Sequence, residues 1–217
     1  MKNLLIKEVK LFAAPITWIF LAFSLMTMIP GYPILLGSFF ISMGLFQSFQ
    51  FGREANDMLY SVLLPVKKGD VVRGRYLFCA LVQLMGFGLM AALTVLRMTL
   101  LGNAEVYVTN PLMNATPYFL AGVLVIFACF NGVFVGGFFK TGWKIGKPYV
   151  IFIILSMLVV LAAEAIPHVP GMGFLSVPSG ERVGVQLILL AAAALIYAGV
   201  TLFSCARSVR RFEGLDL

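Results

Sequence analysis

Six long apolar segments dominate this sequence and restrict what it can fold into. They span residues 11–29, 33–51, 76–101, 117–139, 149–166 and 183–205, and each approaches or exceeds the roughly 20 residues that cross a bilayer. The chain is 61% hydrophobic and 12% charged, whereas an ordinary soluble domain is about 25% charged. Because a water-soluble core of this size could not bury so much apolar surface, the composition excludes a soluble enzyme, a nucleic-acid-binding domain and a disordered chain.

A backbone in lipid must satisfy its own hydrogen bonds, so we expect these segments to be helices. The predicted fold class is an all-α polytopic membrane protein with six transmembrane helices in one domain, residues 1–217. Cytoplasmic loops carry an excess of Lys and Arg. With both termini in the cytoplasm, all of the 16 Lys and Arg residues except Arg97 and Arg182 lie on that side.

Two shorter amphipathic helices are expected at the cytoplasmic surface. The first covers residues 1–10, where apolar and charged side chains alternate at helical spacing and fit the inner membrane surface. The apolar positions are Leu4, Leu5 and Val9, and the charged ones are Lys2, Lys7, Glu8 and Lys10. The alternative is a merely solvated start to the first span.

The second amphipathic helix lies in the only long cytoplasmic loop, residues 52–75. Its apolar positions fall at i, i+3, i+4, i+7 and i+8, which is one face of a helix, and Pro65 ends it. They are Ala55, Met58, Leu59, Val62 and Leu63; the polar positions off this face are Arg53, Glu54, Asn56, Asp57 and Ser61. A passive surface helix that only covers the bundle would show the same pattern.

The stretch after this helix reads Leu64-Pro65-Val66-Lys67-Lys68-Gly69-Asp70-Val71-Val72-Arg73-Gly74-Arg75-Tyr76. It resembles the Leu-Pro-Val-Ser-Arg-x-x-Ile-Val-x-x-Lys-Tyr motif of ABC type-2 transporter permeases, which include phenol-soluble modulin exporters and lantibiotic-immunity permeases. Lys67 stands where Ser is usual, and Lys68 and Arg75 each replace one cation by another. The preceding helix with Glu54 and Asp57 also fits the family pattern.

This resemblance implies that the loop is a coupling helix that docks onto a separate ABC ATPase subunit. The residues expected to take part in ATPase coupling are Arg53, Glu54, Asp57, Met58, Tyr60, Leu64 and Pro65. It further implies a second permease chain, identical or related, in a bacterial plasma-membrane exporter. ATP and magnesium would belong to the partner ATPase, with no cofactor in this chain.

Nucleotide-binding and catalytic signatures are missing from the sequence. The nearest relative of a Walker A loop, residues 142–148, is one residue short and has Pro148 in place of the hydroxyl that holds magnesium. The single histidine, His168, has no carboxylate or cysteine at metal-ligand spacing. Cys79, Cys129 and Cys205 are best interpreted as small apolar fillers. We therefore expect no enzyme activity and no metal site in this chain.

Few polar residues fall inside the expected spans. Arg97 and Glu164 lie near the outer ends of theirs and either snorkel to the interface or form a pair that helps close an outer gate, with Arg182 as a rival partner for Glu164. Asn131 is the most central and serves helix packing or lines a path. Gly132 and Gly136 form a small-xxx-small packing motif. This sparse polar lining favours an amphipathic peptide, lipid or hydrophobic drug as cargo.

Two alternative functions remain open at this point. One is the substrate-capture subunit of a vitamin uptake system, which would need a more polar outer pocket. The other is a membrane scaffold that transports nothing and stimulates no ATPase.

Overall fold

The computed structural model describes residues 2–63, 65–102, 104–177 and 182–214, and these residues form helices and no strand. Five elements precede the predicted ATPase-coupling loop: α1 (Lys2–Lys7), the π-helix η1 (Glu8–Phe12), α2 (Pro15–Phe20), the 3-10 helix η2 (Leu21–Met28) and α3 (Leu36–Glu54). They are followed by α4 (Asp57–Leu63), α5 (Lys68–Leu100), α6 (Glu105–Val108), α7 (Pro117–Cys129), the π-helix η3 (Phe130–Val135) and α8 (Gly136–Phe138). The last elements are α9 (Gly146–Ala165), the 3-10 helices η4 (Ile166–His168) and η5 (Gly173–Ser176), and α10 (Val183–Glu213).

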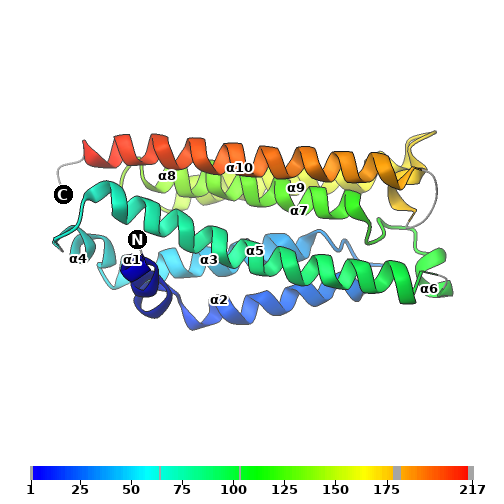
Figure 1. Cartoon of the computed structure of the whole chain (residues 1–217), viewed down its shortest axis with the longest axis horizontal. Helices are drawn as coiled ribbons and strands as arrows, with labels where there is room; N and C mark the ends of the chain where they lie inside the picture. Colours follow the sequence, from blue (N-terminus) through cyan, green and yellow to red (C-terminus); the bar gives the residue numbers. More distant parts are fainter. Residues whose placement is uncertain (1, 64, 103, 178–181, 215–217) are drawn as a thin grey trace.

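The long helices run roughly along one axis and make an elongated bundle (Figure 1). One end of the bundle holds α1, α4 and the C-terminal turns of α10, and we call it the basic end because Lys and Arg concentrate there. The opposite end holds α6, η4 and η5, and we call it the loop end. All elements that the sequence assigns to the cytoplasm thus gather at the basic end.

Within the part of the chain that the structure describes, four helices are long and apolar enough to cross a membrane: Lys68–Leu100, Pro117–Phe138, Gly146–His168 and Val183–Glu213. A fifth is possible if the pair Asn3–Phe12 and Pro15–Met28, which bends by 93°, counts as one span. The expected number of six is not confirmed. Helix α3, expected to span, has 19 residues but includes Gln47, Gln50, Arg53 and Glu54, which lower its hydropathy.

The boundaries around the expected coupling loop also differ from the sequence-based ones. Helix α3 continues to Glu54 and α5 already begins at Lys68, so the segment between these two helices is shorter than residues 52–75. The chain turns between α3 and α4 at Asn56, whose φ is 52°. Asparagine tolerates this left-handed conformation better than other non-glycine residues.

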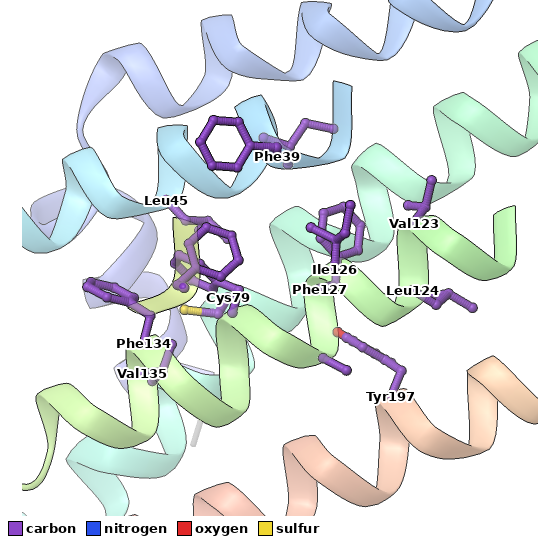
Figure 2. Packing of buried hydrophobic residues seen from close by; sticks show 14 of the residues in the cluster. Phe39, Leu45, Cys79, Val123, Leu124, Ile126, Phe127, Phe134, Val135 and Tyr197 are labelled. Atoms are coloured by element: carbon purple, nitrogen blue, oxygen red, sulfur yellow. The ribbon is translucent and has the colours of Figure 1, made fainter. Parts of the chain in front are cut away.

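The most buried element is the continuous helix formed by α7, η3 and α8. In its apolar window 72% of the residues are buried, compared with 17% in α10, so α10 turns most of its surface outward. Aromatic rings fill the space around the central helix, with Phe130 edge-on to Phe152 at 5.2 Å and Phe134 edge-on to Phe49 at 5.0 Å. Figure 2 shows Tyr197 projecting from α10 toward α7 in the same layer.

Candidate functional site

Helix α4 presents the opposite face to the bundle from the one its apolar spacing predicts. Asp57 and Ser61 are buried, whereas Leu59, Tyr60 and Leu63 are 54%, 53% and 77% exposed. The expected apolar inner face is therefore wrong. The physical reason is that the bundle end beneath α4 contains cations, and buried cations need polar or anionic partners.

Those partners form a four-charge cluster that joins α1, η1, α4 and α5. Lys7 Nζ lies 2.7 Å from Asp57 Oδ1 and 3.2 Å from Glu8 Oε1. Arg75 reaches Asp57 Oδ2 through Nη2 at 2.5 Å and Glu8 Oε2 through Nε at 2.7 Å. Lys7 also donates to Ser61 Oγ at 2.6 Å. Two cations and two anions thus neutralise one another and fix α4 by two side chains one helical turn apart.

The cluster is enclosed by aromatic rings. The guanidinium carbon of Arg75 lies 3.2 Å from the ring centroid of Phe12, and Arg75 is only 2% exposed. Phe12 in turn packs edge-on against Phe49 and Phe78. A Cβ at Gly52 would come within 2.6 Å of the Phe12 ring, so glycine is needed for α3 to approach this closely.

The carboxyl of Asp57 is held ionised in this setting. Burial by itself would raise its pKa, but the adjacent guanidinium of Arg75 and the ammonium of Lys7 outweigh burial and lower the pKa below the usual 3.8. Asp57 was expected to touch a partner ATPase. Its 8% exposure instead makes it an internal anchor of α4.

The other residues expected to couple divide by exposure. Arg53, Glu54, Tyr60 and Pro65 are exposed, and Met58 is half-buried. Leu64 lies outside the described residues. The exposed surface of α4 is consequently apolar and aromatic, consisting of Leu59, Tyr60 and Leu63, with charged Arg53 and Glu54 beside it.

A pocket of about 410 Å³ opens at the basic end next to α4. Its walls come from α3, α4, α5, α8 and the turn that follows α8. They include Phe49, Arg53, Met58, Arg75, Phe138 and Trp143. The pocket therefore joins the ion cluster to the short turn between α8 and α9.

The residue after Arg75 connects the cluster to the opposite side of the bundle. Consecutive helical residues point about 100° apart, so Tyr76 faces α10 while Arg75 faces α4. The Tyr76 hydroxyl lies 2.7 Å from Ser204 Oγ and 3.0 Å from Ser208 Oγ. Ser204 donates to the backbone oxygen of Asn131 at 3.1 Å. The adjacent pair Arg75 and Tyr76 thus ties α4 to α10 through α5.

Asn131 is fully buried and lies in the π-helix η3. Its side-chain amide exchanges two hydrogen bonds with Gln83, at 3.0 and 2.9 Å, and donates a third to Thr201 at 2.9 Å. Tyr197 donates to Gln83 Oε1 at 2.9 Å. The amide therefore joins α5, η3 and α10. A π-helical segment within an α-helix is frequently found at a functional site.

Gly132 and Gly136 both face α10. A Cβ at Gly132 would lie 3.0 Å from Val200 Cγ1, and one at Gly136 would lie 2.7 Å from Ser204 Oγ. The absence of a side chain at these two positions therefore lets α10 approach the central helix closely.

At the loop end, the structure does not bring Arg97 and Glu164 together as an ion pair among the described residues. Arg97 is 3% exposed and donates to Thr27 O at 2.7 Å and to Asn114 Oδ1 at 2.8 Å. Glu164 instead accepts from the backbone amide of Met113 at 2.9 Å. The two are linked only indirectly, through adjacent residues of one loop. Snorkelling of Arg97 is excluded by its burial.

The rival partner Arg182 also lies elsewhere, with its guanidinium carbon 5.2 Å from the ring centroid of Phe174. Another loop-end contact involves His168, whose two ring nitrogens lie 2.8 Å from Glu164 O and 2.9 Å from Pro111 O. Glu164 and His168 thus both hold the loop before α7 against the end of α9.

Several residues of these sites escaped the sequence analysis. Lys7 and Glu8 are expected only as charged positions of an amphipathic helix at the membrane surface, and Gln83 is not singled out, yet each is wholly or largely buried. No sequence pattern around Tyr197 indicates its hydrogen bond to Gln83. A helical spacing of four between Asp57 and Ser61 does mark a common face, but nothing local shows that this face turns inward.

Comparison with known proteins places the chain in a family. A family model described as ABC-2 family transporter protein matches residues 3–213, which is nearly the whole chain. Comparisons with curated proteins and with solved structures gave no match. The match spans the long apolar helices, the ion cluster and the Arg75-Tyr76 junction. The chain is therefore a multi-pass membrane protein of the ABC-2 transporter family.

Proposed function

We propose that the chain is the permease subunit of a bacterial ABC exporter in the plasma membrane. Two permease chains, identical or related, would pair with two ATPase chains. ATP and magnesium would bind in the ATPase chains, and the energy of hydrolysis would reach the permease at its basic end. The cargo would be an amphipathic peptide, a lipid or a hydrophobic drug.

One observation supports this proposal above the others, namely the way α4 is mounted. Its seven residues are too few to form a stable helix in water on their own, yet two buried side chains, Asp57 and Ser61, join α4 to α1 and α5. A short element that transmits force between subunits must be stiff, attached to the spans and exposed on its outer side. The ion cluster supplies the attachment, and Leu59, Tyr60 and Leu63 supply the exposed surface.

The direction of the proposed coupling follows from the same contacts. Movement of α4 would pull on Asp57, and through Arg75 on the first turns of α5. Tyr76 would carry the displacement to α10 and to the backbone of η3. Allosteric coupling of this kind requires a physical element that both sites bias, and α5 is that element here.

Purification of the tagged full chain from its own host in a gentle detergent tests the proposal. We expect a soluble P-loop ATPase in stoichiometric amount, identified by mass spectrometry, and its loss when Tyr60 and Leu63 are both replaced by Asp. Val108→Asp, an exposed loop-end residue that is 66% exposed, is the matched control and should retain the ATPase. Absence of any ATPase, also after chemical cross-linking, would contradict the proposal.

A further inference from the structure

The pocket beside α4 has the composition of a site for an amphiphile. Its volume of about 410 Å³ is within the range of about 300–1,000 Å³ typical of small-ligand sites. Phe49, Met58 and Phe138 supply apolar and aromatic walls, and Trp143 lies at its edge with 56% of its surface exposed. Tryptophan of this kind commonly lies at the headgroup level of a membrane.

The charges at the pocket are unequal in a way that favours an anion. Within the walls, Asp57 and Arg75 already neutralise each other in the ion cluster. Arg53 is exposed at the rim of the pocket and makes no ion pair with any residue that the structure describes. The turn that contributes Trp143 also carries exposed Lys140 and Lys144, and exposed Lys147 lies at the start of α9. The rim is therefore cationic and the interior apolar.

We propose that this pocket binds one anionic phospholipid of the surrounding membrane. The acyl chain would contact Phe49, Met58 and Phe138, and the phosphate would bind Arg53. A lipid is the occupant that the position favours, because two of the walls, α5 and α8, lie at the ends of helices long and apolar enough to cross a membrane, and the rim carries the charge that attracts anionic headgroups. This inference goes beyond the proposed function and does not depend on it. A lipid in this position would contact α4 from its inner side.

Trp143 makes the proposal directly measurable, since the chain has two tryptophans and Trp18 can be removed as Trp18→Phe. The full-length Trp18→Phe protein is placed in lipid nanodiscs that contain increasing fractions of phosphatidylglycerol with brominated acyl chains. Bromine quenches tryptophan fluorescence on contact. We expect half-maximal quenching at an about fivefold lower lipid fraction with brominated phosphatidylglycerol than with brominated phosphatidylcholine of the same acyl chains. A factor of this size corresponds to one contact between a Lys or Arg side chain and an anionic lipid.

Three variants distinguish lipid binding in the pocket from lipid contact elsewhere on the surface. Arg53→Gln should abolish the preference for the anionic lipid, whereas Lys144→Gln, which removes a nearby cation that does not line the pocket, should leave most of it. Met58→Phe should fill the pocket and weaken quenching by both lipids. Size-exclusion profiles matching that of the parent protein verify that each variant is folded.

Three results would overturn the proposal. The first is equal quenching by the two headgroups, and the second is an equal loss of preference in Arg53→Gln and Lys144→Gln. The third is quenching by neither lipid together with a change in Trp143 emission when a purified partner ATPase is added, which would assign the pocket to the partner. Because the lipid titration contains no ATPase, its failure is distinct from failure of the proposed function.

Discussion

At the scale of single residues, the decisive feature is that four charges are buried together at the basic end. Taking Glu8 and Arg75 out of water is costly, and their mutual attraction offsets that cost only when every partner is present. Removing one member leaves an uncompensated buried charge, which typically costs 3–5 kcal/mol. The cluster is thus better suited to fixing the position of α4 than to adding net stability.

Asp57→Asn should lower the free energy of unfolding by about 3 kcal/mol, since Arg75 and Lys7 lose their shared counter-charge. Asp70→Asn is the matched control because Asp70 pairs with Arg73 on the exposed surface, where such pairs are worth about 0–1 kcal/mol. Thermal unfolding in detergent, followed by tryptophan fluorescence, measures both. Equal losses in the two variants would show that the cluster has no special role.

The same carboxyl predicts a dependence on pH. Because the pKa of Asp57 is lower in the folded state than the usual 3.8, its contribution is complete well above that value. It is lost as the pH falls through the lowered folded-state pKa. Stability of the native chain should therefore decline in the acid range below about pH 4 more than that of Asp57→Asn. Parallel pH profiles for the two proteins would contradict this assignment.

The buried amide pair allows a second residue-level prediction. In a double-mutant cycle of Gln83→Leu and Asn131→Leu, the double variant should lose less stability than the sum of the single ones. The expected coupling is about 1 kcal/mol, since side-chain hydrogen bonds between membrane helices average about 0.6 kcal/mol and reach about 1.7 kcal/mol, and this pair makes two of them. Gln186→Leu is the control, because Gln186 donates its hydrogen bond to Phe174 O instead. The stability losses of Gln186→Leu and Gln83→Leu should therefore add in the double variant.

At the scale of elements, the central helix and α10 are held together by close approach and by polar contacts at the same place. Gly136 lets α10 come near enough for Ser204 to reach both Tyr76 and the Asn131 backbone. Packing through small residues is the usual way in which membrane helices associate, because lipid provides no hydrophobic force between them.

Gly136→Ala should separate α10 from η3 and α8 and cost about 1–3 kcal/mol, as overpacking usually does. Gly199→Ala on α10 itself is the control, since a Cβ there meets nothing within 4 Å. The thermal midpoint should fall in the first variant and stay or rise slightly in the second. A fall of the thermal midpoint in both variants would contradict this explanation, because a substitution on the outer face of α10 would then destabilise the protein as well.

The sequence predicts some elements well because their signals are local. Apolar runs locate α5, α7, α9 and α10, and Pro65 correctly marks the end of α4. The face of α4 could not be predicted, because it is decided by Lys7 and Arg75, which lie far away along the chain. The same holds for Gln83 and Asn131, 48 residues apart, and for Arg97, whose partners come from another helix and a loop.

At the scale of the whole molecule, the chain links two ends of very different character. The basic end gathers the cluster, α4 and the pocket, whereas the loop end is held by hydrogen bonds of Arg97, Glu164 and His168. Helix α5 has 33 residues and spans about 50 Å at the usual rise. It passes from Arg75 and Tyr76 at one end to Arg97 at the other, so a movement of its first turns can reach the loop end.

The proposed coupling requires that α4 is the surface that a partner ATPase touches. The direct measurement places a photo-reactive amino acid at Leu63, which is 77% exposed on α4, or at Leu100, which is 74% exposed at the loop end. Irradiation in intact cells, followed by mass spectrometry, identifies what each position contacts. We predict that Leu63 cross-links to a P-loop ATPase and that Leu100 does not. An ATPase cross-linked at Leu100, or none at Leu63 in a folded and expressed protein, would contradict the account.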